Sequence, residues 1–224
     1  NYLRRRVAQG FTYASIVCPG CPVPPELVER FPSMDFGAIY RLNNYRRDKF
    51  DSVEVTVRHT LRRQYGWLAS YTRSRALSNG VVDLNIDDPI IVSRNVGPMP
   101  WDAPHRFLSW GYLPLKLKDW AAAYLLDTRS GFPFSSRTDV GAVVGDLNSW
   151  RFPVFFTLNL HIERKVALLG HKWELRAGYN NLTNRRNPTL VNSNVDSVNY
   201  MSFYGGQGRT LNFRIRWLGR VVDR

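Results

Sequence analysis

The sequence predicts an all-β protein, specifically an antiparallel transmembrane β-barrel segment that forms part of a larger barrel. Three observations predict it. Apolar and polar residues alternate along most of the chain, the alternating runs reach about ten residues, and the connections between them alternate between short and long. A period of two is typical of strands with one apolar and one polar face. Strands of soluble sheets usually have about 5–6 residues, whereas tilted membrane-spanning strands have about 9–11.

The expected strands form a meander of about seven to nine long elements. The alternation is clear in the last third of the chain, where Trp173, Leu175 and Ala177 are separated by polar residues. Val53 and Val55 begin a similar run earlier in the chain. The clearest strands are expected near 51–61, 66–75, 105–114, 119–128, 153–164, 172–182 and 208–217, with weaker candidates near 2–16 and 36–44.

The connections between these strands differ in length in a regular order. The short ones are 62–65, 115–118 and 165–172, and the long ones are 73–103, 128–152 and 183–207. The long connections are rich in Gly, Pro, Asn, Asp and Ser. Short periplasmic turns and long external loops are typical of outer-membrane barrels, whereas soluble sandwiches have turns every 8–12 residues or so without this asymmetry.

Composition excludes other classes. With 224 residues and 44% hydrophobic residues the chain can fold, so wholesale disorder is excluded. No apolar run reaches the roughly 18–20 residues of a membrane helix, which excludes a helical membrane protein. The net charge is +13, and most of the cations are arginines, which suit fixed hydrogen bonds. Residues 1–6 lack the apolar segment of a signal peptide, so we expect one domain, 1–224, with no signal peptide.

Large aromatic residues lie on the rows that we expect to be apolar, several of them near the ends of expected strands. Girdles of Trp and Tyr at the lipid–water interface explain this placement. The alternative is a soluble core, but the apolar row would then need a partner sheet. The expected interface aromatics are Trp67, Tyr71, Trp110, Trp120, Trp173 and Trp217.

Charged residues lie on the opposite rows. An arginine on a lipid-facing row costs about 2–4 kcal/mol at the membrane midplane, whereas charges in a hydrated lumen cost little. We therefore expect an ion-paired, lumen-facing row made of Glu54, Arg58, Glu163, Glu174, Arg176, Arg214 and Arg216. Arginines of the long connections could meet lipopolysaccharide phosphates or an anionic solute, or be ordinary loop charges: Arg94, Arg137, Arg185 and Arg186.

Several motifs, each at an expected strand end or loop, resemble one family. They are Phe50–Val55 followed by Leu61–Arg63, then Ala69–Leu77, Asp102–Phe107, Ser130–Phe134, Tyr179–Pro188 and Gly205–Leu211. In this order they resemble the C-terminal barrel of TonB-dependent outer-membrane receptors, in particular the type with a carboxypeptidase-regulatory-like N-terminal domain. The likeness covers roughly residues 30–218.

The resemblance implies TonB-dependent uptake of an unidentified solute across the bacterial outer membrane by the intact protein, without covalent catalysis and without a cofactor. The implied partners are outer-membrane lipid, lipopolysaccharide, the solute, and the TonB complex through a plug domain that this chain lacks. Plugged transporter barrels have 22 strands, so seven to nine strands indicate a truncated or split receptor or a partial gene model. The family generally ends on an aromatic residue, whereas this chain continues beyond Trp217.

Other residues with chemical potential give weaker signals. Cys18 and Cys21 form a CxxC followed by prolines, which fits a loop disulfide better than a redox pair or half a zinc site. That loop is periplasmic if 36–44 crosses the membrane and external if 36–44 belongs to a loop hairpin. None of the four histidines has a metal-ligand spacing, so we expect no metal site and no enzyme.

Two other functions remain open. A stand-alone small outer-membrane barrel with a structural or passive-pore role would need an even strand number such as eight or ten. A soluble basic β-protein that binds nucleic acid would carry aromatics among its cations. Because Trp and Tyr lie mostly on the row opposite the cations, we expect no nucleic-acid partner.

Overall fold

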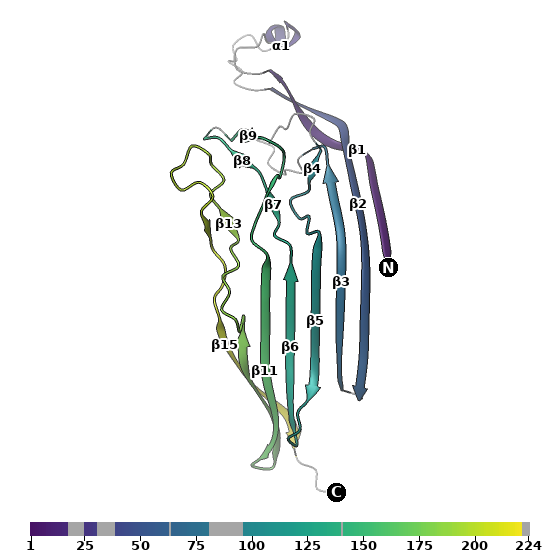
Figure 1. Ribbon diagram of the computed structural model, residues 1–224, viewed down its shortest axis with the longest axis vertical. Helices are drawn as coiled ribbons and strands as arrows, with labels where there is room; N and C mark the ends of the chain where they lie inside the picture. The colour runs from purple at the N-terminus through teal and green to yellow at the C-terminus, as the bar shows by residue number, and fades with distance from the viewer. Residues whose placement is uncertain (18–24, 31–38, 63, 81–95, 140, 221–224) are drawn as a thin grey trace.

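The computed structural model describes residues 1–17, 25–30, 39–62, 64–80, 96–139 and 141–220. These residues form long antiparallel strands and one short helix, α1 (Pro25–Arg30), so the all-β prediction is confirmed (Figure 1). No helix in the described ranges is long and apolar enough to cross a membrane.

Eight long strands pair side by side, each with its neighbour in the sequence, and a two-residue strand extends the sheet to nine. The long strands are β1 (Tyr2–Val17), β2 (Ile39–Arg62), β3 (Tyr65–Ser78), β5 (His105–Pro114), β6 (Trp120–Arg129), β11 (Phe155–Leu168), β12 (His171–Asn180) and β15 (Thr210–Arg220). β4 (Gly97–Pro98) pairs with β3. Among the described strands, β1 and β15 are the edges of an open sheet and do not pair with each other.

Short two-residue strands fold the long connections onto themselves. The pairs are β7 (Pro133–Phe134) with β10 (Trp150–Arg151), β8 (Ser136–Arg137) with β9 (Val143–Val144), and β13 (Leu190–Val191) with β14 (Phe203–Tyr204). All three lie beyond the same ends of the long strands (Figure 1). We call this end of the sheet the loop end and the opposite end the short-turn end.

The predicted alternation of connection lengths is confirmed. A two-residue turn joins β11 to β12 through Leu169 and Gly170, whose φ angles are 54° and 73°. Two central residues with positive φ define a turn whose twist matches that of the flanking strands. The turn after β5 likewise contains Asp119, with φ of 63°.

The separate strands predicted at 36–44 and 51–61 are wrong, because β2 runs unbroken from residue 39 to 62. Charged residues near 45–49 interrupt the alternation in the sequence. They do not interrupt the strand, because β2 pairs with β1 on one side and with β3 on the other. Arg46 and Asp48 also form an ion pair of 3.2 Å. β1 therefore ends, and β2 begins, on the side of the loop end. Cys18 and Cys21 lie outside the described residues.

The strand register sorts side chains onto two faces, because residues directly opposite each other share a face. The face that carries Val55, Tyr71 and Phe107 is here called the apolar face. The face that carries Glu163 and Arg176 is called the charged face. Val55 is 59% exposed, whereas Glu163 is only 5% exposed. The valines of the apolar face are therefore exposed, whereas carboxylates of the charged face are buried.

Trp110 is on the charged face, not with the other tryptophans as predicted. It lies opposite Leu68 and Leu125, and Leu68 lies opposite Arg58. Apolar residues occupy both alternating rows of β5, so the alternation could not show which row lies on the apolar face. The contacts of Gly111 explain why its row lies there.

Gly111 lies between Trp67 and Tyr124 on the apolar face. A Cβ at Gly111 would be 2.5 Å from Cε1 of Tyr124 and 3.0 Å from Cβ of Trp67. The missing side chain leaves room for the tyrosine ring. A glycine in a strand commonly marks such a close approach.

A buried polar network fastens the long connections to the sheet. Asp102 is 3% exposed, and its Oδ1 accepts the Ala76 amide at 2.6 Å. Its other oxygen forms an ion pair of 2.6 Å with Arg151, which also donates to the carbonyl oxygen of Gly131. Phe134, Phe152 and Phe203 pack edge to face beside it. The motifs at 69–77, 102–107 and 130–134 thus meet at the loop end.

The sheet has little core of its own. The accessible surface is 16052 Å², whereas a folded monomer of 25.9 kDa is expected to expose about 10,500 Å². In the described ranges the buried apolar residues are Ala76, Met99, Ala121, Phe134 and Leu147, four of which lie in or beside the long connections. A single layer of strands cannot cover both of its faces.

We expect Asp102→Asn to loosen the loop end without unfolding the long strands. The carboxylate holds a backbone amide and a guanidinium, and such charged hydrogen bonds contribute about 1.5–3 kcal/mol each. Hydrogen exchange at the Ala76 amide and across 97–104 should accelerate at least tenfold. Glu29→Gln, on an exposed residue of α1, is the charge-matched control. Unchanged exchange in Asp102→Asn would show that the network does not hold the loops.

Candidate functional site

A connected group of ionisable side chains lies on the charged face of β11, β12 and β15. Arg214 donates through Nη2 to Oε1 of Glu174 at 2.9 Å, and the same nitrogen lies 3.9 Å from Oε2 of Glu163. The Tyr112 hydroxyl of β5 donates to Glu163 from the other side. We call Tyr112, Glu163, Glu174 and Arg214 the charged cluster.

Both carboxylates of the charged cluster are nearly buried, with Glu163 5% and Glu174 7% exposed. Arg214 remains about half exposed at 48%. A buried carboxylate is stable only where it is paired or hydrogen-bonded. The cluster therefore ties three neighbouring strands and β5 together on the face opposite the valines.

A second contact lies beside the charged cluster. Arg176 Nη2 is 3.2 Å from His161 Nδ1. The His161 ring lies over Gly178, where a Cβ would be 2.9 Å from the ring Cδ2. A small cavity of about 260 Å³ separates these residues from Asn212 and Arg214. The face is thus polar and hollowed at this point.

The predicted ion-paired row is only partly brought together. Glu163, Glu174, Arg176 and Arg214 are neighbours, whereas Arg216 lies opposite Glu174 without an ion pair among the described residues. Glu54 and Arg58 belong to the distant strand β2. Glu54 accepts hydrogen bonds from Ser70 at 2.8 Å and Thr56 at 3.2 Å.

Sequence reasoning missed Tyr112 because the parity of β5 was assigned wrongly. It also did not connect His161 with Arg176. The signal for that contact was present, since Gly178 follows two residues after Arg176 and lies opposite His161.

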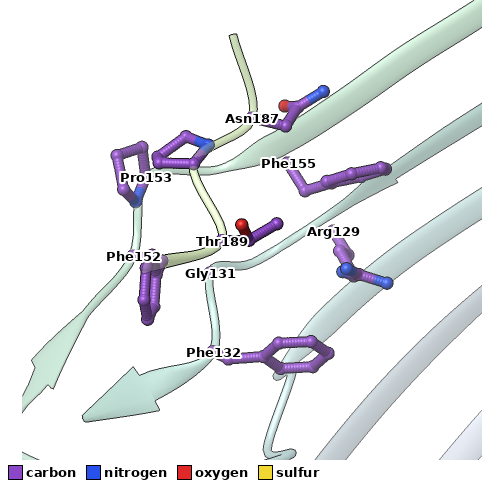
Figure 2. A pocket seen from close by; sticks show the side chains of 9 residues that line it. Arg129, Gly131, Phe132, Phe152, Pro153, Phe155, Asn187 and Thr189 are labelled. Atoms are coloured by element: carbon purple, nitrogen blue, oxygen red, sulfur yellow. The ribbon is translucent and has the colours of Figure 1, made fainter. Parts of the chain in front are cut away.

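A different site lies at the loop end, where β6 and β11 enter their long connections (Figure 2). It is a cavity of about 250 Å³ between the strand ends and the segment 187–189. The Arg129 guanidinium lies 4.4 Å from the ring centroid of Phe132 and 4.3 Å from that of Phe155. Cation–π contacts of this kind fix the arginine between two rings.

Asn187 positions the far wall of this cavity. Its Oδ1 accepts the amide of Phe156 at 3.0 Å, and its Nδ2 donates to the carbonyl oxygen of Phe156 at 2.9 Å. Asn181 holds the other end of the same connection by donating to Arg185 and Gln207 carbonyl oxygens. The asparagines of the 179–188 motif therefore hold the connection in place through hydrogen bonds to backbone groups.

A larger open hollow of about 940 Å³ adjoins this cavity and shares Phe155, Asn187 and Thr189 with it. Its lining is mostly amides and hydroxyls, including Asn180, Gln207 and Thr210. Aromatic faces, a shielded cation and amide groups can stack on and hydrogen-bond an organic solute. Sequence reasoning placed Phe132, Asn187 and Gln207 in motifs but did not bring them together.

The residues predicted to form an aromatic girdle lie at different places in the sheet. Trp67, Trp120 and Trp173 lie on the apolar face near the short-turn end. Trp217 pairs with Trp173, and His171 contacts both rings. Tyr71 lies nearer the loop end, where its hydroxyl is 2.7 Å from Nδ1 of His105.

The predicted loop arginines have varied surroundings. Arg137 is half-buried in β8, and its backbone bonds to Ser193 and Val195. Arg185 and Arg186 are exposed. Arg94 lies outside the described residues. Within the described ranges, no group of three or more His, Cys, Asp or Glu side chains could hold a metal ion.

Comparison of the chain with protein-family models, with curated proteins and with solved structures found no match.

We expect Arg214→Met to destabilise the fold by about 1–2 kcal/mol, because it leaves two nearly buried carboxylates without their cation. Arg216→Met, on the same face of the same strand but without such a contact, should change stability by less than about 0.5 kcal/mol. Urea unfolding followed by tryptophan fluorescence measures both values. Equal effects of the two substitutions would show that the charged cluster contributes nothing.

Proposed function

We propose that the chain is the barrel segment of a bacterial outer-membrane receptor that takes up a solute in a TonB-dependent manner. The observation that carries the proposal is the inverted polarity of the sheet. Valines and aromatics are exposed on one face, while glutamates are buried on the other. A lipid-exposed barrel wall requires this arrangement, and a soluble sheet avoids it.

The distribution of charge on the apolar face supports this proposal. Between Phe156 and Arg164, that face of β11 carries only uncharged residues. The same holds from Trp173 to Tyr179 on β12 and from Leu211 to Trp217 on β15. Eight residues of β11 at about 3.3 Å each span about 26 Å before any tilt, comparable with the apolar band of about 25 Å in membrane barrels.

The two ends of the sheet support an orientation. The tryptophans Trp67, Trp120, Trp173 and Trp217 fit an interfacial girdle at the short-turn end. We assign that end to the periplasm and the loop end to the outside, because outer-membrane barrels have short turns on the periplasmic side. On this assignment the end of β1 at Val17 and the start of β2 at Ile39 are external.

The loop-end cavity with Arg129, Phe132 and Phe155 is the place where we propose that the solute first binds. Arg129 and Phe155 lie on the charged face, which becomes the lumen wall. On the same face Leu68, Trp110 and Leu125 form an apolar patch, and Trp110 is 43% exposed. We propose that the plug domain of the intact receptor covers this patch. Uptake then consists of binding and gating, with no covalent step.

One observation favours a second candidate, a stand-alone small barrel. The sheet has eight long strands, an even number that small outer-membrane barrels use. Closure would require β1 and β15 to pair. A nucleic-acid-binding sheet is less well supported, because Trp67, Trp120, Trp173 and Trp217 lie on the face opposite the charged cluster.

We expect Val55→Arg to lower the folded, membrane-inserted fraction, because the arginine would lie in the lipid at a cost of about 2–4 kcal/mol. Thr56→Arg, on the adjacent residue of the charged face, should be tolerated. Both positions are exposed, so a soluble sheet would accept both substitutions equally. The measurement is heat-modifiable electrophoretic migration of the gene product in outer membranes of a Gram-negative host. Equal folded fractions for the two variants contradict the membrane proposal.

We also expect the coding sequence upstream of Asn1 to encode further alternating strands, a plug domain and a signal peptide. The physical reason is that a partial barrel leaves unpaired backbone groups at both edges, which lipid does not tolerate. Sequencing the locus measures this directly. A start codon immediately before Asn1 would favour the small barrel over the receptor.

A further inference from the structure

Basic side chains gather on the apolar face where the first residues of β1 and the middle of β2 pair with the loop end of β3. The register places Arg4, Asp51 and Arg75 in one row across the three strands. The next row toward the loop end contains Arg6 and Lys49, and the next row toward the short-turn end contains Arg73. Because neighbouring strands are roughly 4.8 Å apart, one row spans about 10 Å. We call Arg4, Arg6, Lys49, Arg73 and Arg75 the basic patch.

The basic patch has more positive than negative side chains. Asp51 is its acidic side chain, and Arg6 occupies both carboxylate oxygens at 2.9 and 2.8 Å. Arg4 approaches the same carboxylate at 3.9 Å. Arg73 and Arg75 are exposed and have no ion pair or side-chain hydrogen bond within the described part of the chain. Five cations around one carboxylate repel each other unless another anion joins them.

The uncharged part of the same face begins directly next to the basic patch. Below Arg73 on β3 follow Tyr71, Ala69 and Trp67 toward the short-turn end. Beside them on β2 lie Val55 and Val57, which are 59% and 52% exposed. A ligand that lies on this surface therefore meets cations at one end and exposed apolar side chains at the other.

We propose that the basic patch binds the phosphate groups of an anionic lipid in the leaflet at the loop end, with the acyl chains of that lipid on the neighbouring valines. The guanidinium fork of arginine matches phosphate oxygens, and basic clusters next to an apolar span bind anionic headgroups. A free phosphate ion would leave the exposed valines uncovered, so the continuity with the apolar face points to a lipid. This inference rests on the proposed membrane function.

The basic patch is separate from the candidate solute site. Arg129 and Phe155 lie on the charged face, and the basic patch lies on the apolar face. It also differs from the loop arginines Arg185 and Arg186, which follow the end of β12. Solute binding and lipid binding can therefore be changed independently.

The test uses the gene product folded in a nonionic detergent and measures its affinity for bisphosphorylated lipid A. Arg73→Gln combined with Arg75→Gln should weaken binding at least about tenfold, because the two unpaired guanidiniums are lost. Lipid A without its phosphates should bind weakly to both proteins. Inorganic phosphate at millimolar concentration should not displace the phosphorylated lipid.

Two further variants keep the test independent of folding defects. Arg58→Gln combined with Arg216→Gln removes the same charge from the opposite face and should leave lipid affinity unchanged. Asp51→Asn removes the carboxylate that occupies Arg6 and should tighten lipid binding several-fold. A gain of affinity cannot arise from misfolding.

Equal lipid affinity in the wild type and the Arg73→Gln/Arg75→Gln protein would overturn the inference. So would displacement of the lipid by millimolar inorganic phosphate, which would show an ordinary anion site. The proposed function fails separately, through equal folded fractions of Val55→Arg and Thr56→Arg. If those fractions differ while phosphorylated lipid fails to bind the wild type, the membrane proposal is retained and the lipid site is rejected.

Discussion

The register of the long strands is the constraint on which the rest of the structure depends. Because paired residues share a face, one consistent register from β2 to β15 directs the aliphatic side chains of these strands mainly to one side of the sheet. Nothing in the described chain covers that side, where Val55 is 59% and Phe213 62% exposed. The backbone hydrogen bonds hold the strands together, and the burial that stabilises a globular domain has to come from the surroundings. Lipid supplies it under the proposed function.

In the described part of the chain, the long connections meet at the loop end, and polar side chains fasten them to the sheet. Asp102 joins the end of β3 to Arg151, while Asn181 and Asn187 fasten the 181–209 connection to β11. Short side chains that bond to backbone groups fix a loop without needing an apolar core. Asn187 lines the cavity with Arg129 and Phe155, and Arg151 bonds to the carbonyl oxygen of Gly131 in the cavity wall. The candidate solute site is therefore held by Asn187 of the 179–188 motif and, through Arg151, by Asp102.

Alternation was sufficient to place β3, β5, β6 and β12 within a few residues, since each carries a regular polar or apolar row between turn signals. It failed where side-chain pattern and backbone pairing diverge. Charged residues near 45–49 broke the pattern of β2 but not its hydrogen bonds. In β5, apolar residues on both parities concealed that Gly111, not Trp110, faces Tyr124. The cavity was out of reach because it joins residues as distant as Arg129 and Asn187, and no local period encodes such a contact.

The two faces differ more clearly in where their arginines lie along the strands than in their hydrophobicity. On the charged face, Arg176 and Arg214 occur in the middle of their strands. On the apolar face, arginines occur at the margins, with Arg73 and Arg75 toward the loop end and Arg164 beside Trp120 near the short-turn end. An aqueous environment on both faces imposes no such difference, because an exposed arginine costs little at any height of a strand. A lipid layer does impose it, since the cost is about 2–4 kcal/mol at the midplane and about 0–1 at the interfaces. The unequal numbers of cations at the two margins follow if the leaflet at the loop end carries the phosphates.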